Sequence, residues 1–215
     1  LEFIPVAEET GLIIPMNRLL LSEACKDLQA WQAEFPANPP LTMSVNITPR
    51  EFAQPNLAYE IGQILERLNF DPAWLQLEIV ETIAMGDEEK SGQALAQLKA
   101  IGVHLSIDDF GTGYSSLSRL RRIPVDTLKI DRSFIMNMDT DAENREIVKT
   151  IIMLAHNLGL KVVAEGTETE KHIFQLRELK CEMAQGYFYS RPADSLTMLK
   201  LLAGNQNARA AAAAG

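Results

Sequence analysis

The sequence predicts an α/β protein in which parallel strands form a barrel covered by helices. Strand and helix patterns alternate about six times with short connections, and this alternation indicates a parallel sheet with helices on its faces. Polar residues stand at or near the strand ends, which a closed barrel gathers on one face and an open sheet spreads along an edge. No glycine-rich GxGxxG or GxxxxGKS/T run supports an open nucleotide-binding sheet, so the barrel is favoured.

Length and composition limit the classes of protein to which this chain can belong. The 215 residues suit one domain, and 47% apolar and 23% charged residues are ordinary for a soluble globular chain. The net charge of −9 and the lack of long Lys or Arg runs disfavour a DNA or RNA polymer as partner, but not a small nucleotide held through metals. Two cysteines indicate neither a disulfide framework nor a zinc site. We expect a cytoplasmic domain, or the cytoplasmic part of a larger signalling protein whose membrane contacts would lie in other domains.

The first helix is predicted to begin at Pro15. Leu19, Ala24 and Leu28 are among the apolar residues that recur at helical spacing behind it. The prolines of FPANPP (35–40) end the pattern, because proline lacks the amide hydrogen that a helix interior needs.

Two further strand–helix units follow. Mainly apolar runs predict the strands, the second of which is interrupted by Glu78, and apolar residues three or four apart predict the helices. Pro49 suits a helix start because its fixed φ matches the first turn. The predicted elements are a strand at 41–47, a helix opened by Pro49 and reaching Leu68, a strand at 75–80 and a helix at 88–100.

The central stretch carries the densest set of chemical groups. It begins as a strand, 105–107, and ends in two acids, Asp108 and Asp109, before a glycine-bearing turn. The next strand, 125–130, contains a buried-looking cation, Lys129. Burying these charges is costly unless metal ions or a phosphate compensate them.

The alternation continues to the C-terminus. Segment 206–215 is low in complexity, so we expect it to fray and assign residues 1–205 to the domain. The predicted elements are a helix at 141–158, a strand at 160–164 ending in Glu165, a helix at 168–179, a short strand through Gln185 and Tyr187, and a helix from 194.

In a barrel, the polar residues at the strand ends would share one cavity. Several carboxylates in one cavity repel each other, and oxygen ligands of this kind select hard divalent ions such as Mg²⁺ or Mn²⁺. A two-metal site suits phosphoester hydrolysis, in which Lys129 would orient water or contact a phosphate oxygen and Glu165 is a candidate general base. The residues are Asn46, Glu78, Asp108, Asp109, Lys129, Glu165 and Gln185.

Each of these residues also has a plainer interpretation. Glu78 alone could be solvated, and the two aspartates could start a turn. Lys129 could extend to solvent from an edge strand, and Asn46 could cap the next helix. Repetition of the same placement on strand after strand favours the functional interpretation. The histidines, which show no ligand spacing and are interpreted as structural, are His104, His156 and His172.

Six segments, taken in this order, match a pattern known from other proteins. They are EFIPVAEETGLI (2–13), SVNITPREF (44–52), LQLEIVET (75–82), IDDFGTGYSSLSRLRRIPVDTLKIDRSFI (107–135), VVAEGTETE (162–170) and QGYFYSRP (185–192). DDFGTGYSSL followed by VDTLKIDRSF is the most specific of them. Together they resemble the EAL domain, the cyclic di-GMP phosphodiesterase family of bacterial signalling.

The resemblance implies a modified TIM (β/α)8-type barrel that hydrolyses cyclic di-GMP to linear pGpG with two Mg²⁺ or Mn²⁺ ions. It implies that Lys129 contacts the nucleophilic water, that Glu168 and Gln185 are further active-site residues, and that Glu81 steadies the loop after Asp109. That loop and its neighbouring helix would form a homodimer interface. By position, the implied metal ligands are Asn46, Glu78, Asp108, Asp109 and Glu165.

One part of the family pattern lies outside this sequence. The Glu-Ala-Leu motif, the arginine after it and the preceding strand would stand upstream of segment 2–13. We therefore expect the barrel to lack its first strands, and a genuine truncation would leave weak metal binding at most and little turnover. The alternative function is a catalytically inactive module that acts as a cyclic di-GMP receptor or a protein-interaction domain.

Overall fold

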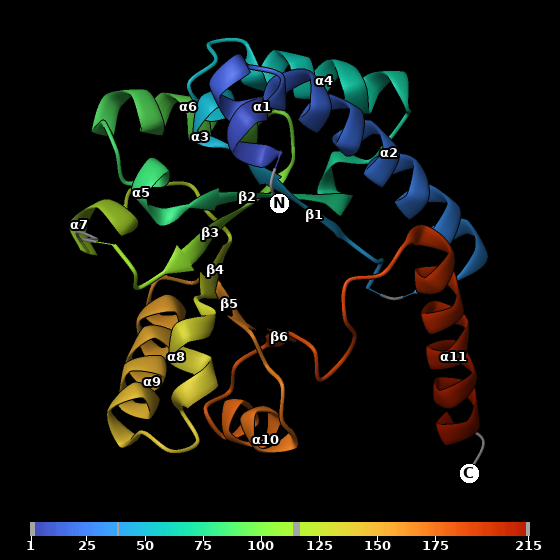
Figure 1. Ribbon diagram of the computed structural model, residues 1–215, viewed down its shortest axis with the longest axis vertical. Coiled ribbons are helices and arrows are strands. Elements are labelled where there is room, and N and C mark those ends of the chain that lie inside the picture. The colour runs from blue at the N-terminus through green and yellow to red at the C-terminus, as the bar shows by residue number, and fades with distance from the viewer. Residues whose placement is uncertain (1–2, 38, 114–116, 214–215) are drawn as a thin grey trace.

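Six parallel strands form one curved sheet with helices on its outer side in a computed structural model of the chain (Figure 1). The structure describes residues 3–37, 39–113 and 117–213, with side chains as far as residue 204. Neighbouring strands pair in chain order, and within these ranges the first and last strands do not pair with each other, so the sheet is a half-barrel. The strands are β1 (Met43–Ile47), β2 (Leu75–Val80), β3 (His104–Phe110), β4 (Thr127–Ile130), β5 (Lys161–Glu165) and β6 (Met183–Gln185).

Most helices follow a strand and pack on the convex side of the sheet, whereas α11 stands apart from it (Figure 1). The described helices are α1 (Ile4–Thr10), α2 (Ile13–Glu34), α3 (Pro49–Phe52), α4 (Leu57–Arg67), the 3-10 helix η1 (Pro72–Trp74), α5 (Glu81–Ala84), α6 (Glu88–Ala100), α7 (Leu117–Leu120), α8 (Arg132–Asn137), α9 (Ala142–Asn157), α10 (Glu170–Glu178) and α11 (Ser195–Ala213). None of them, in the described part of the chain, combines the length and apolar composition that crossing a membrane requires.

Strand register separates an apolar outer face from a polar inner face. Side chains alternate along a strand, so residues in register share one face. One row, on the helix side, is apolar and buried: Ile47, Ile79, Ile107, Leu128 and Val162. The preceding row, on the inner face, is polar throughout: Asn46, Glu78, Ser106, Thr127 and Lys161.

The predicted barrel-type α/β fold is confirmed, with its ring of strands incomplete as expected. Several predicted boundaries are wrong. The helix that we expected to begin at Pro15 is α2, and it begins at Ile13. A proline in the first turn of a helix costs no helical hydrogen bond, so the helix can start before it. Helix α1 precedes α2 and was not predicted. We expected a single helix after Pro49, but the structure has two, α3 and α4. Pro55 lies between them and interrupts the helix.

Two other predictions need correction. Strand β3 does not stop at Ile107 but continues through both aspartates to Phe110. Helix α11 extends through most of segment 206–215, to Ala213, where we expected fraying. Alanine has the highest intrinsic helix propensity, which explains why this backbone is helical.

Candidate active site and metal centre

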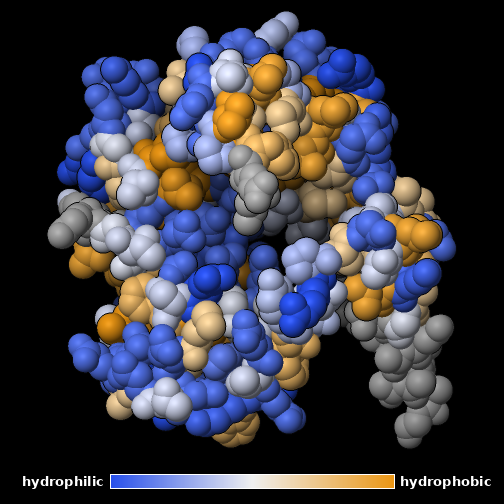
Figure 2. Space-filling model, in the orientation of Figure 1, coloured by the Kyte–Doolittle hydropathy of each residue, from blue (hydrophilic) through white to orange (hydrophobic). Residues whose placement is uncertain are grey.

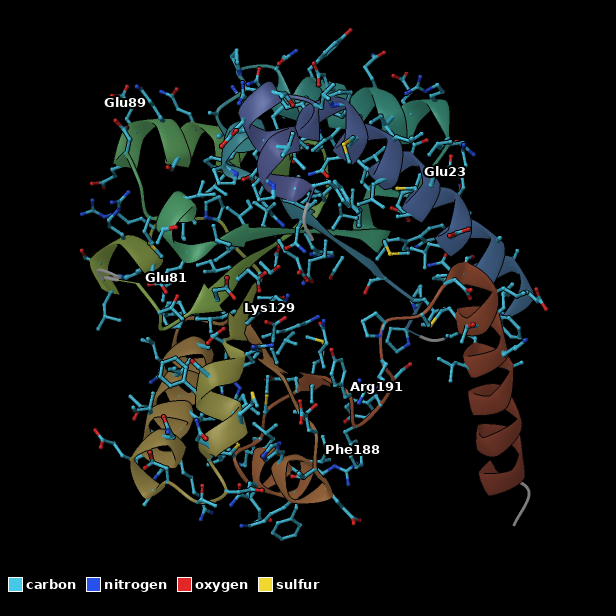
Figure 3. All side chains as sticks on the ribbon, in the orientation of Figure 1. Glu23, Glu81, Glu89, Lys129, Phe188 and Arg191 are labelled. Atoms are coloured by element: carbon cyan, nitrogen blue, oxygen red, sulfur yellow. The ribbon has the colours of Figure 1, made fainter. Side chains whose placement is uncertain are left out.

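Lys129 lies in the middle of the inner face and points into the concave side of the half-barrel (Figure 3). Its Nζ lies 2.5 Å from Glu78 Oε2, 2.6 Å from Glu165 Oε1 and 2.9 Å from Asp108 Oδ1. Only 3% of its side chain is exposed. Burial alone would lower the pKa of Lys129, but attraction to Glu78 and hydrogen bonds to Glu165 and Glu78 outweigh burial and raise it. Lys129 is therefore a fixed cation that joins acids from three other strands.

A β-bulge brings two adjacent aspartates to the same side of β3. Neighbouring residues in a regular strand face opposite sides of a sheet, so Asp108 and Asp109 would normally diverge. The register against β4 shifts between Ile107 and Phe110, and Asp109 has a left-handed φ of 53°. Aspartate tolerates this conformation better than most residues. The bulge turns the Asp109 carboxylate towards the cavity that Asp108 already faces.

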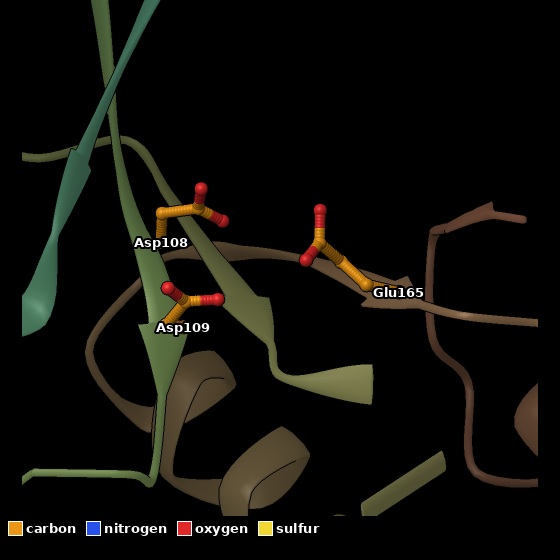
Figure 4. Close-up of side chains that lie close together, drawn as sticks. All are labelled: Asp108, Asp109 and Glu165. Carbon is orange, nitrogen blue, oxygen red and sulfur yellow. The ribbon is translucent and has the colours of Figure 1, made fainter. Parts of the chain in front are cut away.

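Asp108, Asp109 and Glu165 form an acidic cluster (Figure 4). One carboxylate oxygen from each residue lies within 4.8 Å of the others. Burial, followed by the charge of Asp108, raises the pKa of Asp109. Burial also raises the pKa of Glu165, against the hydrogen bond from Lys129. With Glu78 nearby, four carboxylates face one ammonium group, so the cluster has an excess of negative charge.

The chemistry of this cluster fits a hard divalent cation. Asp108 Oδ1 is buried, and although it lies 2.9 Å from Lys129 Nζ, the geometry is not that of a hydrogen bond; no other partner occurs among the described residues. A buried carboxylate oxygen that shares its cationic neighbour with two other acids is poorly compensated, and a further cation would satisfy it. Carboxylate oxygens are the ligands that Mg²⁺ and Mn²⁺ prefer.

Glu81 holds the loop that follows the bulge. It begins α5, is 2% exposed, and its Oε2 accepts hydrogen bonds from the amides of Gly111, at 2.8 Å, and Gly113, at 3.4 Å. Gly111 has a φ of 100°, and a Cβ there would lie 2.7 Å from the ring of Phe134. The loop therefore requires both the glycine and the buried acid.

Glu168 and Gln185 lie with Glu165 along a cleft of about 190 Å³ beside the acidic cluster. Arg132 and Tyr187 also line this cleft. Glu165 and Gln185 are register partners on β5 and β6, whereas Glu168 stands on the loop before α10. The face of the molecule drawn in Figure 2 has a hollow at its centre, which is bordered mainly by hydrophilic residues.

Asn46 shares the inner face with Glu78, its register partner on β2. It differs from the other predicted ligands because it is exposed, at the edge strand β1. The structure thus gathers Glu78, Asp108, Asp109 and Glu165 near Lys129 and leaves Asn46 at the margin.

The sequence analysis missed Asp131, which follows β4. Its carboxylate caps α8 by accepting from the amide of Ser133 at 2.9 Å, and it interacts with the carboxyl group of Asp109. Burial would raise the pKa of Asp131, but hydrogen bonds from Ser133 outweigh burial and lower it. A further acid directly after strand 125–130 was the signal that could have identified it.

Comparison with known proteins gives one consistent match. A family model described as "EAL domain" matches residues 1–192. The chain is 41% identical over 202 residues to the bifunctional diguanylate cyclase/cyclic di-GMP phosphodiesterase MucR of Pseudomonas aeruginosa, covering 94% of this chain and 29% of that protein. It is 42% identical to the cyclic di-GMP phosphodiesterase NbdA of the same organism, covering 88% of this chain and 24% of NbdA. The chain thus spans less than a third of the length of either relative.

Solved structures agree with this match. The PaMucR phosphodiesterase in complex with c-di-GMP superposes with a TM-score of 0.87 at 40% identity, covering 92% of this chain and 79% of that one. The enzyme Bd1971, in its cAMP and cyclic-di-GMP bound form, gives a TM-score of 0.87 at 34% identity, covering 93% of this chain and 55% of that one.

Proposed function

Because the chain belongs to the EAL domain family, we propose that it hydrolyses cyclic di-GMP to linear pGpG with two divalent cations, Mg²⁺ or Mn²⁺. Relatives that share about two-fifths of its sequence are named cyclic di-GMP phosphodiesterases. The observation that carries the proposal is the convergence of Asp108, Asp109 and Glu165 beside Lys129, because three carboxylates within 4.8 Å suit a divalent cation.

The metal ligands in this proposal come from four strands of the sheet, β1, β2, β3 and β5. Asp108, Asp109 and Glu165 hold the cations, with Glu78 and Asn46 completing the set from β2 and β1. When bound, such cations activate water and neutralise the charge that develops on a phosphodiester during hydrolysis. The bulge at Asp109 is essential to the proposal, because without it one of the two adjacent acids would face the helices.

The remaining site residues orient the reactants. Lys129 is held as a cation by the acids around it and donates hydrogen bonds from Nζ, so it suits the attacking water or a phosphate oxygen. Glu165 and Glu168 face the cleft where Gln185 can donate to the substrate. Glu81 keeps the loop after Asp109 in place through the amides of the loop.

Assembly and location are also part of the proposal. We assign a homodimer interface to the loop after Asp109 and its adjacent helix; residues 114–116 of this loop lie outside the described residues. We place the domain in the cytoplasm, which the resemblance to a bacterial signalling family implies. In this proposal cyclic di-GMP, rather than a nucleic acid polymer, is the partner.

Hydrolysis of cyclic di-GMP by this chain with Mg²⁺ or Mn²⁺, followed as the appearance of pGpG, tests the proposal. Asp108→Ala should lower turnover by about 100-fold or more, because loss of a preorganised electrostatic contact has an effect of that size. Glu146→Gln, at an exposed acid on α9, is the matched control and should leave turnover unchanged.

The outcomes separate the two candidate functions. Turnover that Asp108→Ala abolishes supports the phosphodiesterase. Turnover that survives this substitution contradicts the metal centre. Binding of cyclic di-GMP without any turnover would favour the inactive receptor.

A further inference from the structure

His172 connects the loop that carries Glu165 and Glu168 to the end of α8. Its Nδ1 accepts a hydrogen bond from the backbone amide of Glu168 at 3.3 Å. Its Nε2 lies 3.4 Å from Oδ2 of Asp139, two residues beyond α8. Only 5% of the His172 side chain and 17% of the Asp139 side chain are exposed, so solvent competes little for either contact.

The contacts define the tautomer of the imidazole. Because Nδ1 accepts an N–H, the proton of the neutral ring is on Nε2, which faces the carboxylate of Asp139. The same carboxylate oxygen accepts from Thr169 Oγ1 at 3.3 Å, and Lys171 Nζ donates to the Asp139 carbonyl at 2.9 Å. Asp139 is therefore fixed from two sides and orients the ring.

Helix capping explains how the ring reaches Glu168. Thr169 is the N-cap of α10 and accepts from the amide of His172 at 3.1 Å. In a capping box the side chain three residues after the cap reaches back to the amide of the cap residue. Here it reaches one residue further, to Glu168, so a side chain from the first turn of the helix also holds the loop before it.

We propose that His172 is a positioning residue, which holds the Glu168 backbone so that Glu165 and Glu168 face the cleft shared with Gln185. This inference rests on the proposed phosphodiesterase function. Other contacts fix the rest of the loop: Gly166 packs against Arg132 with a φ of 73°, and the amide of Thr167 donates to the Gln185 carbonyl at 3.1 Å. The amide of Glu168 depends on His172.

Two substitutions separate positioning from packing. In His172→Gln, the amide oxygen can accept from Glu168 and the amide nitrogen can donate to Asp139. In His172→Phe, a ring of similar size remains but its acceptor is lost. We expect His172→Phe to lower kcat about 10-fold with little change in KM, because small misplacements of a reacting group cost that much, and His172→Gln to stay within about 2-fold of wild type.

A stability control accompanies these variants. Asp126→Asn weakens the contact in which Asp126 Oδ2 accepts from the Leu105 amide at 2.8 Å, directly before β4 and away from this loop. It should lower the melting temperature without lowering kcat. If His172→Phe and Asp126→Asn lower kcat equally at matched loss of stability, or if His172→Gln is as impaired as His172→Phe, the positioning role is wrong.

Amide hydrogen exchange of this chain, read by NMR, tests the contact independently of turnover. The Glu168 amide should be protected in wild type and His172→Gln, and exchange about 10-fold faster or more in His172→Phe, because the acceptor is lost. Unchanged exchange in His172→Phe overturns the inference. If wild type shows no turnover but exchange of the Glu168 amide still depends on His172, the proposed function is overturned. The hydrogen bond between Glu168 and His172 then still stands.

Discussion

Lys129 illustrates how single residues in this site balance each other. It is a buried cation that three acids contact, and removing either side would leave the other buried and uncompensated. The four nearby carboxylates still exceed its single charge, which is the reason a cation binding at Asp108, Asp109 and Glu165 would be favourable. The same residues thus serve stability and chemistry.

Asp126 provides a residue-scale test of stability at the opposite end of β4. Its Oδ2 accepts from the Leu105 amide at 2.8 Å and from Lys99 Nζ at 2.9 Å. Burial would raise the pKa of Asp126, but these hydrogen bonds outweigh burial and lower it. We expect Asp126→Asn to reduce the free energy of unfolding by roughly 1 kcal/mol at pH 7, because a charge-assisted hydrogen bond is weakened.

The pH dependence of this difference has a definite sign. An acid whose pKa is lowered by folding stabilises the fold above its unfolded pKa, about 3.9, and loses that contribution as the pH falls through the folded value. His104 Nδ1 also lies 3.5 Å from Asp126 Oδ2, so the comparison is made in a His104→Asn background. In that background, urea denaturation should give a constant effect of Asp126→Asn from pH 7 to pH 5, and a smaller one below about pH 4. A difference that grew on acidification would contradict the assigned contacts, and Glu146→Gln should show neither effect.

At the scale of elements, the sequence predicted where strands and helices lie along the chain better than it predicted irregularities within them. Strand β2 and helix α6 have the predicted bounds, because the spacing of their apolar residues and the flanking turn residues define them. The bulge in β3 was not predicted, since it depends on pairing with β4, which no pattern within β3 specifies. The clustering of Glu78, Asp108 and Glu165 followed from strand ends, whereas the roles of Asp131 and His172 depend on contacts between elements.

Gly186 tests how β6 joins the sheet. A Cβ at this position would lie 2.2 Å from the Thr167 carbonyl oxygen and 2.4 Å from its nitrogen. We expect Gly186→Ala to lower the free energy of unfolding by about 1–3 kcal/mol or more, because backbone atoms cannot move aside as a flexible side chain would.

The matched control is Gly92→Ala in α6, where an added Cβ meets nothing within 4 Å. Here the same substitution should leave stability unchanged or raise it by about 0.5–1 kcal/mol, since alanine favours a helix. Chemical denaturation of both variants makes the comparison. Equal effects at the two positions would mean that the close approach of Gly186 to Thr167 is not what constrains this residue.

At the scale of the whole molecule, the acidic cluster predicts that stability depends on divalent cations. A cation at about 100 times its dissociation constant stabilises a single-site protein by about 2.7 kcal/mol, which raises the melting temperature of a chain of this size by several degrees. We expect Mn²⁺ to produce such a rise in wild type, measured by differential scanning calorimetry.

Asp109→Asn should abolish this rise while keeping the fold, because asparagine also tolerates a left-handed φ. Without metal, this variant should be at least as stable as wild type, since burial and the charge of Asp108 disfavour an ionised Asp109. Glu146→Gln should keep the full response. A Mn²⁺ response retained in Asp109→Asn would place the cation elsewhere.

The order of the strands in the sheet is also their order in the chain, from β1 to β6. Each strand pairs with the one made just before it, so no strand has to wait for a distant part of the polypeptide. A ribosome releases about 5–20 residues per second, and a chain with this topology can add one strand and its covering helix at a time as it emerges. Synthesis itself would then set the sequence of assembly, and the acids of β2 and β3 would be in place before Lys129 of β4 is added beside them.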